Sequence, residues 1–320
     1  MRRSRLGRAV VMSSWVALAI GCAGGEEAPP QDGAMAEESP DSGNFTERMY
    51  ERNVVFASVV GDSAFFVPWM LHTVETPDTV LREAHAWLAR GGVWDGFVSE
   101  VWGSAPTRSP SRILPHGGLQ LFVREGGAID GLLFEEGPRE LEVLLDDLRA
   151  SWVGTGGGSY DVLGGSAYLA DQRIDGMVLD MSRSSADGQA PGGDWAFLLS
   201  GDSAQFVFVG ETEHGGDTAP PYRGWGTRGA EGDLRWGQVD VEWGRREAFP
   251  PARRDVPAEW RLTTADGSLD GSIEALSGEL IAGEGPGPLL PVRALFEVTG
   301  TLETSEGSYP VYGLFVHERR

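Results

Sequence analysis

Two apolar, β-rich runs joined by a short turn constrain the fold of this chain more than any other stretch. Residues 195–199 read Trp-Ala-Phe-Leu-Leu and residues 205–209 read Gln-Phe-Val-Phe-Val, with Ser-Gly-Asp-Ser at 200–203 between them. Such runs around a Gly-Asp turn predict a β-hairpin. Five tryptophans lie in or after this hairpin: Trp195, Trp225, Trp236, Trp243 and Trp260. They could line one large apolar interior, or they could be ordinary core residues.

The composition favours a mainly β protein with many turns. The chain has 320 residues, including 46 Gly and 19 Pro, and 41% of its residues are hydrophobic. Glycine and proline at this level suit a turn-rich β fold better than a helical one. The length is sufficient for one large domain or two ordinary ones.

The charge of the chain excludes several classes of function. The formal net charge is −22, which repels nucleic acid, so we expect no nucleic-acid partner. All 26 basic residues are Arg, because the sequence contains no Lys. The absence of lysine rules out Schiff-base chemistry and lysine-dependent phosphate binding.

The amino terminus predicts export and a lipid anchor. Four arginines precede an apolar stretch at 9–20, which is shorter than the roughly 20 residues that span a bilayer. The sequence Leu-Ala-Ile-Gly-Cys at 18–22 contains the only cysteine, Cys22, and resembles the lipobox of bacterial lipoproteins. The resemblance implies lipidation of Cys22 and a place in the bacterial cell envelope, at the outer membrane facing the periplasm or the cell surface. An ordinary signal peptide with an incidental cysteine is the alternative.

The rest of the chain reads mostly as strands and turns. One exception is the segment 77–102, where one helical face would carry Val80, Leu81, Ala84, Trp87 and Leu88 before Gly-Gly at 91–92. This segment predicts a helical hairpin, whereas residues 138–152 fit a helix and a strand equally. The expected organisation is a signal peptide at 1–21, a flexible tether at 22–44, an N-terminal β unit with the helical hairpin at 45–185, a linker at 186–193 and a C-terminal β unit at 194–320.

The sequence contains no convincing motif for a metal site or a catalytic nucleophile. The five histidines are far apart and have no ligand-like spacing. One segment resembles a calcium-binding loop, with oxygen-bearing side chains and a glycine at Asp266, Ser268, Asp270 and Gly271. The last position of such a loop needs a bidentate glutamate, and Ser277 stands there instead. A β-turn explains this pattern, so we expect no metal ion and no cofactor.

Three segments resemble one known family. Gly-Asp-Trp-Ala-Phe at 193–197, Val-Pro-Ala-Glu-Trp-Arg-Leu at 256–262 and Ala-Leu-Phe-Glu-Val-Thr-Gly at 294–300 follow the order of elements in the lipocalin-like carotenoid hydratase (hydroxyneurosporene synthase) family. The family's Trp-Asp-Trp corresponds here to Gly193-Asp194-Trp195. The resemblance implies two lipocalin-like antiparallel β units, and it implies apolar, often isoprenoid, ligands.

Three functions follow from these features. The first is binding or carrying an apolar small molecule or lipid among the five tryptophans, by a protein held at the membrane through its lipid anchor. The second is a hydratase or isomerase of isoprenoids, in which Asp194 would be the acid, because alkene hydration needs a carboxylic acid kept protonated in an apolar pocket. The third is a structural or partner-binding envelope lipoprotein with a filled core. The sequence does not indicate an oligomeric state.

Overall fold

A computed structural model describes residues 47–60, 63–105, 116–123, 129–137, 139–170, 172–185, 191, 193–201, 204–210, 218–229 and 232–319. The predicted signal peptide, Cys22 and the tether lie outside the described residues, as does the linker apart from residues 191 and 193. Residues 44–320 form one compact unit. Within the described ranges, none of the helices is long and apolar enough to cross a membrane.

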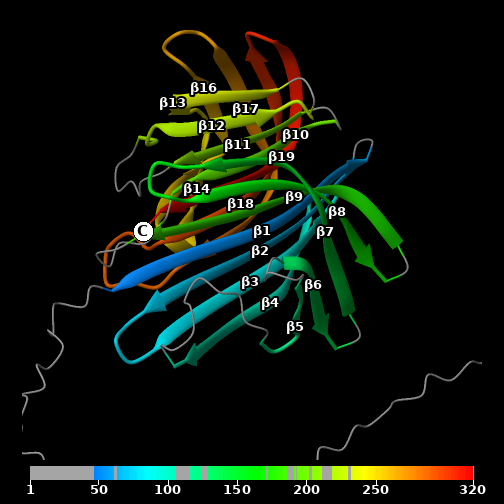
Figure 1. The fold of residues 1–320 in the computed structure, drawn as a ribbon. Helices are drawn as coiled ribbons and strands as arrows, with labels where there is room; N and C mark the ends of the chain where they lie inside the picture. The colour runs from blue at the N-terminus through cyan, green and yellow to red at the C-terminus, as the bar shows by residue number, and fades with distance from the viewer. Residues whose placement is uncertain are drawn as a thin grey trace, which may run out of the picture. The chain divides into compact units, whose positions relative to one another are not determined.

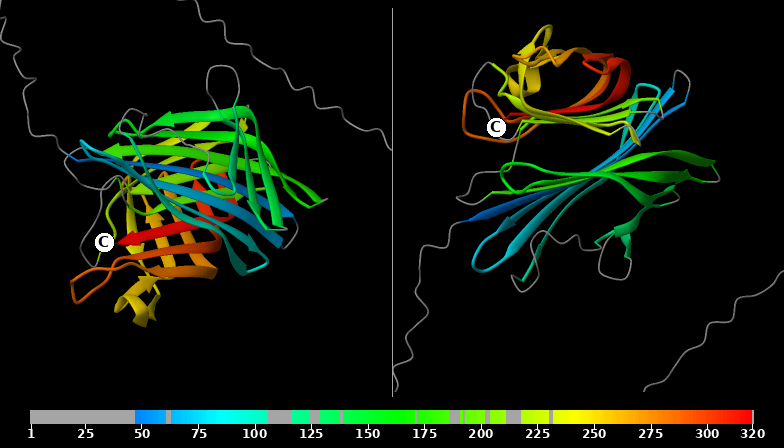
Figure 2. Two further views of the ribbon diagram at one scale, coloured as in Figure 1. Left: turned by 90° about the horizontal axis from the view of Figure 1, so that it is seen from below. Right: turned by 45° about the horizontal axis from the view of Figure 1, so that its top comes forward.

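The first half of the compact unit is a nine-stranded antiparallel sheet, drawn from blue to green in Figure 1. Its strand order is β4-β3-β2-β1-β9-β8-β7-β6-β5. Figure 2 shows that the sheet curls, and an ion pair of 2.5 Å between Arg139 and Asp95 joins β7 to β4 across the curl. The strands are β1 (Arg48–Val60), β2 (Ser63–Glu75), β3 (Val80–Arg90), β4 (Val93–Ser104), β5 (Leu119–Val123), β6 (Ile129–Glu136), β7 (Arg139–Val153), β8 (Ser159–Leu169) and β9 (Gln172–Ser185).

The second half is a closed antiparallel barrel, in which β10 pairs with both β11 and β19. A small hairpin of β14 (Arg246–Phe249) and β15 (Arg254–Pro257), with a 3-10 turn at Pro250–Ala252, interrupts the barrel sequence. The barrel strands are β10 (Trp195–Ser200), β11 (Ala204–Gly210), β12 (Tyr222–Thr227), β13 (Asp233–Trp243), β16 (Glu259–Thr263), β17 (Leu269–Ala282), β18 (Val292–Thr304) and β19 (Gly307–Arg319). The predicted hairpin and the mainly β class are confirmed.

The predicted helical hairpin at 77–102 is wrong, because this segment forms the β-hairpin β3–β4. Val80, Ala84 and Ala86 are buried on one face, as period-2 alternation requires. A register shift between Ala86 and Trp87 then moves the pattern by one residue. The apolar spacing of three and four residues that imitates a helix therefore comes from a bulged strand. Residues 138–152, which fit both structures, lie mostly in strand β7.

Alternation along the strands produces three apolar clusters. One cluster lies between the sheet and the barrel, one lies inside the barrel, and one lies on the opposite face of the sheet. Inside the barrel, Trp260 stacks on Phe315 with ring centroids 4.1 Å apart, and Phe206 and Phe208 both pack against Trp236. Aromatic rings of the described side chains therefore pack against one another in the barrel interior.

Candidate functional site

The five tryptophans singled out by sequence separate into two groups. Trp236, Trp243 and Trp260 belong to the cluster inside the barrel, whereas Trp195 and Trp225 belong to the cluster between the sheet and the barrel. Successive side chains of a strand point to opposite faces of the sheet. The side chain of Trp195 therefore points out of the barrel toward the first sheet, and that of the next residue, Ala196, points into the barrel. The structure therefore does not bring these five side chains to one lining.

Trp225 contacts the first sheet directly. Its ring lies 6.2 Å from that of Trp152 and 4.9 Å from that of Tyr160, and both partners come from the sheet. Trp195 is fully buried in the same cluster. Both tryptophans thus pack the barrel wall against the sheet.

Asp194 lies at one end of the barrel interior and is buried, with 2% of its surface exposed. Its carboxylate accepts hydrogen bonds from the Tyr222 hydroxyl at 2.5 Å and from the backbone N–H of Glu318 at 3.1 Å. The Nδ1 atom of His317 lies 2.9 Å from Oδ1 of Asp194. Burial, reinforced by this carboxylate, raises the pKa of Tyr222. Asp194 therefore ties β10 to β12 and β19 through a buried polar cluster.

A row of polar residues crosses four strands on the face of the sheet that meets the barrel. Arg183 of β9 is the register partner of Glu51 of β1, Glu51 is that of His72 of β2, and His72 is that of Glu83 of β3. The next residue inward on this face of β1 is the buried Asn53, and beyond it Val55 and Ala57 belong to the apolar cluster between sheet and barrel. We call Arg183, Glu51, His72 and Glu83 the polar row.

Two residues of the barrel wall complete this network. Arg293 of β18 and Glu318 of β19 are register partners, and Nε of Arg293 donates to Oε1 of Glu318 at 2.6 Å. Nη2 of Arg293 lies 2.6 Å from Nε2 of His72. Because a guanidinium only donates, this histidine nitrogen must accept, which places the imidazole proton on Nδ1. The pair thus joins the barrel to the polar row.

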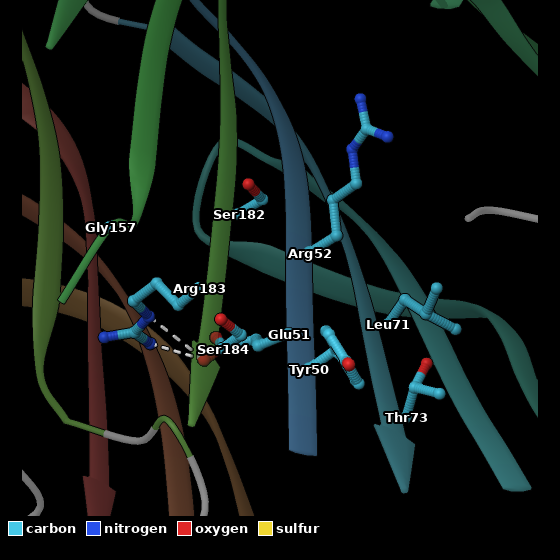
Figure 3. Close-up of a pocket in the computed structure, with 9 residues that line it drawn as sticks. All are labelled: Tyr50, Glu51, Arg52, Leu71, Thr73, Gly157, Ser182, Arg183 and Ser184. Carbon is cyan, nitrogen blue, oxygen red and sulfur yellow. Dashed lines mark hydrogen bonds and ion pairs between the residues drawn. The ribbon is translucent and has the colours of Figure 1, made fainter. Parts of the chain in front are cut away.

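Glu51 is the most enclosed carboxyl of the polar row. Arg183 donates to its Oε2 from Nε at 3.1 Å and from Nη2 at 2.6 Å, as Figure 3 shows by dashed lines. Asn53 donates to its Oε1 at 2.5 Å. Only 2% of Glu51 is exposed, so its contacts lie out of bulk water.

The two buried glutamates of the network differ in acidity. Burial raises the pKa of Glu51, and the nearby Glu318 carboxylate adds to the rise, although Arg183 opposes it. For Glu318 burial acts in the same direction, but the charge and hydrogen bond of Arg293, together with the charge of Arg183, outweigh it and hold the pKa at about 2. Neighbouring carboxyls with pKa values displaced in opposite directions are the arrangement from which acid and base roles arise.

The network also has the residue types of a metal site. One atom each of Glu51, His72 and Glu318 lies within 4.8 Å of the others. Arginine side chains, however, already contact each of these groups, since Arg183 binds Glu51 and Arg293 binds both His72 and Glu318. A cation would have to displace two guanidinium groups, so these residues do not fit a metal ion.

Two hollows border the network. The barrel-side hollow, of about 250 Å³, lies between β3 and strands β17 to β19, and its walls are Glu83, His85, Ile281, Ala282, Gly283, Pro291, Val292, Arg293, Glu318 and Arg319. The sheet-side hollow, of about 220 Å³, is bordered by Tyr50, Glu51, Arg52, Leu71, Thr73, Gly157, Ser182, Arg183 and Ser184 (Figure 3). Asp194 and the five predicted tryptophans line neither hollow.

No protein-family model matches this sequence, and neither does any curated protein. Solved structures do match. A protein from Nitrosomonas europaea that carries the provisional name AttH has a TM-score of 0.55 at 12% identity, over 91% of this chain and 98% of its own. Kievitone hydratase from Nectria haematococca has a TM-score of 0.52 at 12% identity, over 84% of this chain and 88% of its own.

The fold is lipocalin-like. This confirms the fold expected from the family resemblance, with the exception of the helical hairpin. At 12% identity the two structures establish the architecture of the chain alone, and its chemistry must be argued from its own residues.

Sequence reasoning missed the residues of the network. The spacing of Glu51, Arg183 and Glu318 from the charged residues of their own strands marks no motif. A signal did exist, because Glu318 continues a face of its strand on which Leu314 and Val316 are apolar. Their convergence depends on strand pairing between residues that are far apart in the chain, which the sequence pattern does not reveal.

Proposed function

We propose that this protein binds a small molecule with an apolar body and a polar group in the barrel-side hollow. One observation carries the proposal: the hollow has an apolar wall facing a charged one. Ile281, Pro291 and Val292 supply apolar surface, while Arg293 and Glu318 supply hydrogen-bonding groups. Ligand sites typically combine a mainly apolar lining with a few polar groups that orient the ligand.

The size and charge of the hollow restrict the ligand. An apolar cavity of about 150 Å³ holds benzene, so a hollow of about 250 Å³ has room for a somewhat larger molecule. Arg293 and Glu318 already neutralise each other, which favours an uncharged polar group on the ligand. Each buried CH₂ contributes about 0.8 kcal/mol, so a short isoprenoid alcohol suits the site.

We place the ligand outside the barrel interior, although the sequence predicts it inside. Aromatic rings such as those of Trp260 and Phe315 occupy the barrel interior, so the proposed site lies on the outer wall of the barrel. The site lies against the first sheet, since Glu83 and His85 belong to β3.

Titration with geraniol tests this proposal. The ring of Trp87 lies 5.5 Å from that of His85, so ligand in the hollow should change tryptophan fluorescence. Ala282→Phe fills the hollow and should weaken binding roughly tenfold or more. Leu276→Phe, at an exposed position of the same strand, is the matched control and should bind as the unaltered protein does. Absence of saturable binding, or equal binding by both variants, would favour the structural or partner-binding lipoprotein instead.

Acid–base chemistry is a second candidate, supported by the opposite pKa displacements of Glu51 and Glu318. In hydration, a carboxylic acid gives its proton to one alkene carbon, and a carboxylate takes a proton from the water whose oxygen bonds to the other. The pKa directions match Glu51 to the first role and Glu318 to the second, and one atom of each lies within 4.8 Å of the other. The alkene would have to enter between them, because the two residues line different hollows. Asp194, the acid proposed from sequence, remains a competing candidate because it too is a buried carboxyl.

We also propose that the chain is anchored in a bacterial cell envelope through lipidated Cys22. The support is the lipobox-like sequence at 18–22 and the polar, small-residue segment that follows it. A ligand site carried on such a tether would be held close to a membrane, where apolar molecules concentrate.

A further inference from the structure

We infer that the sheet-side hollow is a second binding site, for an uncharged, hydroxyl-rich small molecule of the size of a monosaccharide or cyclic polyol. The two hollows share none of their lining residues, so this inference stands independently of the ligand proposed for the barrel-side hollow. The sheet-side hollow borders β1, β2 and β9 and the turn at Gly157 (Figure 3).

Strand register places hydroxyl groups side by side along this hollow. Ser184 of β9 is the register partner of Tyr50 of β1, and Tyr50 is that of Thr73 of β2. One position further along, Ser182 is the register partner of Arg52. These residues alternate with the polar row along their strands, so their side chains take the opposite face of the sheet. The result is a wall of hydroxyls, as a ligand with many oxygens requires.

One buried polar group at this hollow lacks a partner. Thr73 is 1% exposed, and its Oγ1 has no hydrogen-bond partner among the described residues. A buried hydroxyl without a partner is costly, and a ligand that offers an oxygen to Thr73 would remove that cost.

The charges around the hollow favour an uncharged ligand. Asp180 binds Arg52 through two contacts of 2.9 and 2.6 Å, and Glu51 neutralises Arg183. An anion would therefore bury a charge with no unpaired cation among the described lining residues to balance it. A purely apolar molecule would leave Thr73 without a partner. A neutral molecule with several hydroxyls meets both conditions.

Ligand-detected NMR and calorimetry on the full chain test the inference, with D-glucose and myo-inositol as neutral probes and D-glucuronate as an anionic probe of matched size. We expect saturable binding of at least one neutral probe, and roughly tenfold weaker binding of glucuronate. Thr73→Val keeps the shape of the side chain but removes the hydroxyl, and it should weaken binding roughly tenfold. Thr73→Ser should retain binding, and Thr301→Val, an exposed site in the barrel, should leave it unchanged.

A blocking variant covers the case in which Thr73→Val fails to fold. Ser184 is exposed at the margin of the hollow, so Ser184→Trp should obstruct the hollow without disturbing the core. Loss of neutral-probe binding in this variant supports the site. The inference is overturned if neither neutral probe binds, if glucuronate binds as tightly, or if Ser184→Trp binds normally. Ala282→Phe should not affect these probes, so failure here is distinguishable from failure at the barrel-side hollow.

Discussion

The backbone N–H of Glu318 donates a hydrogen bond to Oδ1 of Asp194 at 3.1 Å. The side chain of Glu318 lies on the opposite face of β19, where it pairs with Arg293. Glu318 therefore belongs to two buried polar groups at once, the Asp194 cluster inside the barrel and the network against the sheet. A substitution of Asp194 should therefore disturb the ion pair of Arg293, and a substitution of Arg293 should disturb the Asp194 cluster, because Glu318 connects the two.

The free energy of unfolding should depend less on pH in Glu318→Gln than in the unaltered protein. The pKa of Glu318 falls from an ordinary 4.5 to about 2 in the folded protein, so its contribution is complete above pH 4.5 and is lost as the pH falls toward 2. The variant should lose this part of the acid sensitivity. It should also be less stable at pH 7 by about 3–5 kcal/mol, because Arg293 loses its only carboxylate partner among the described residues.

Urea unfolding measured between pH 2 and pH 7 checks this expectation. Glu274→Gln, at an exposed position of β17, is the matched control and should follow the unaltered protein. Parallel pH profiles for Glu318→Gln and the unaltered protein would show that Glu318 is not held ionised by the network.

Glu51→Gln and Asp194→Asn distinguish the two candidate acids of the hydratase hypothesis. If Glu51 is the acid, Glu51→Gln should abolish water addition to an isoprenoid probe, and Asp194→Asn should retain measurable turnover. Because burial raises the pKa of Glu51, the rate should fall as the pH rises through that pKa and the proton is lost. Incorporation of solvent deuterium and of labelled water oxygen into the probe measures the reaction, and the reverse pattern would assign the acid to Asp194.

Trp260→Ala tests whether the barrel interior is packed. Trp260 is fully buried and stacks on Phe315 at 4.1 Å, so its removal should cost about 3–5 kcal/mol of unfolding free energy. Leu276→Ala, at a position that is 53% exposed, should change stability by less than about 0.5 kcal/mol. A cost below about 1 kcal/mol for Trp260→Ala would indicate a hollow barrel.

Cys22→Ser tests the lipid anchor. The variant should leave the membrane fraction after cell fractionation, because the single site of lipidation has been removed. Mass spectrometry of the unaltered mature protein should show acyl chains. Membrane association that persists in the variant, together with a mature mass that lacks lipid, would refute the lipoprotein hypothesis.

The sequence pattern predicted the fold class correctly because the fold class follows from local features of the chain. Apolar runs around a Gly-Asp turn marked the 195–209 hairpin, which the structure confirms. The segment 77–102 failed for an equally local reason, since a single bulge at Ala86 and Trp87 changes period-2 alternation into spacing that resembles a helix. Bulges are set by the strands on either side, and these are not visible in the segment itself.

The candidate site was less predictable than the fold. Asp194 was identified from a motif, and the structure places it in a buried cluster with Tyr222 and His317. The network of Glu51 and Glu318 carries no motif, because these two residues lie at opposite ends of the folded chain. Their relationship arises from the packing of the sheet on the barrel, and single-residue patterns contain no information about that packing.

The pairing of β1 with β9 has a consequence for how the chain reaches its native state. Met49 is the register partner of Ser185, so the first strand of the sheet cannot gain its second neighbour until the last strand is available. The barrel has the same property, because Trp195 is the register partner of Val316. Such distant pairings slow folding, because closing a long loop costs conformational entropy before the stabilising contacts between the strands can form. Both halves therefore depend on late strands to cover early edges, and a chain that ends before residue 172 would expose β1 and β8 to aggregation.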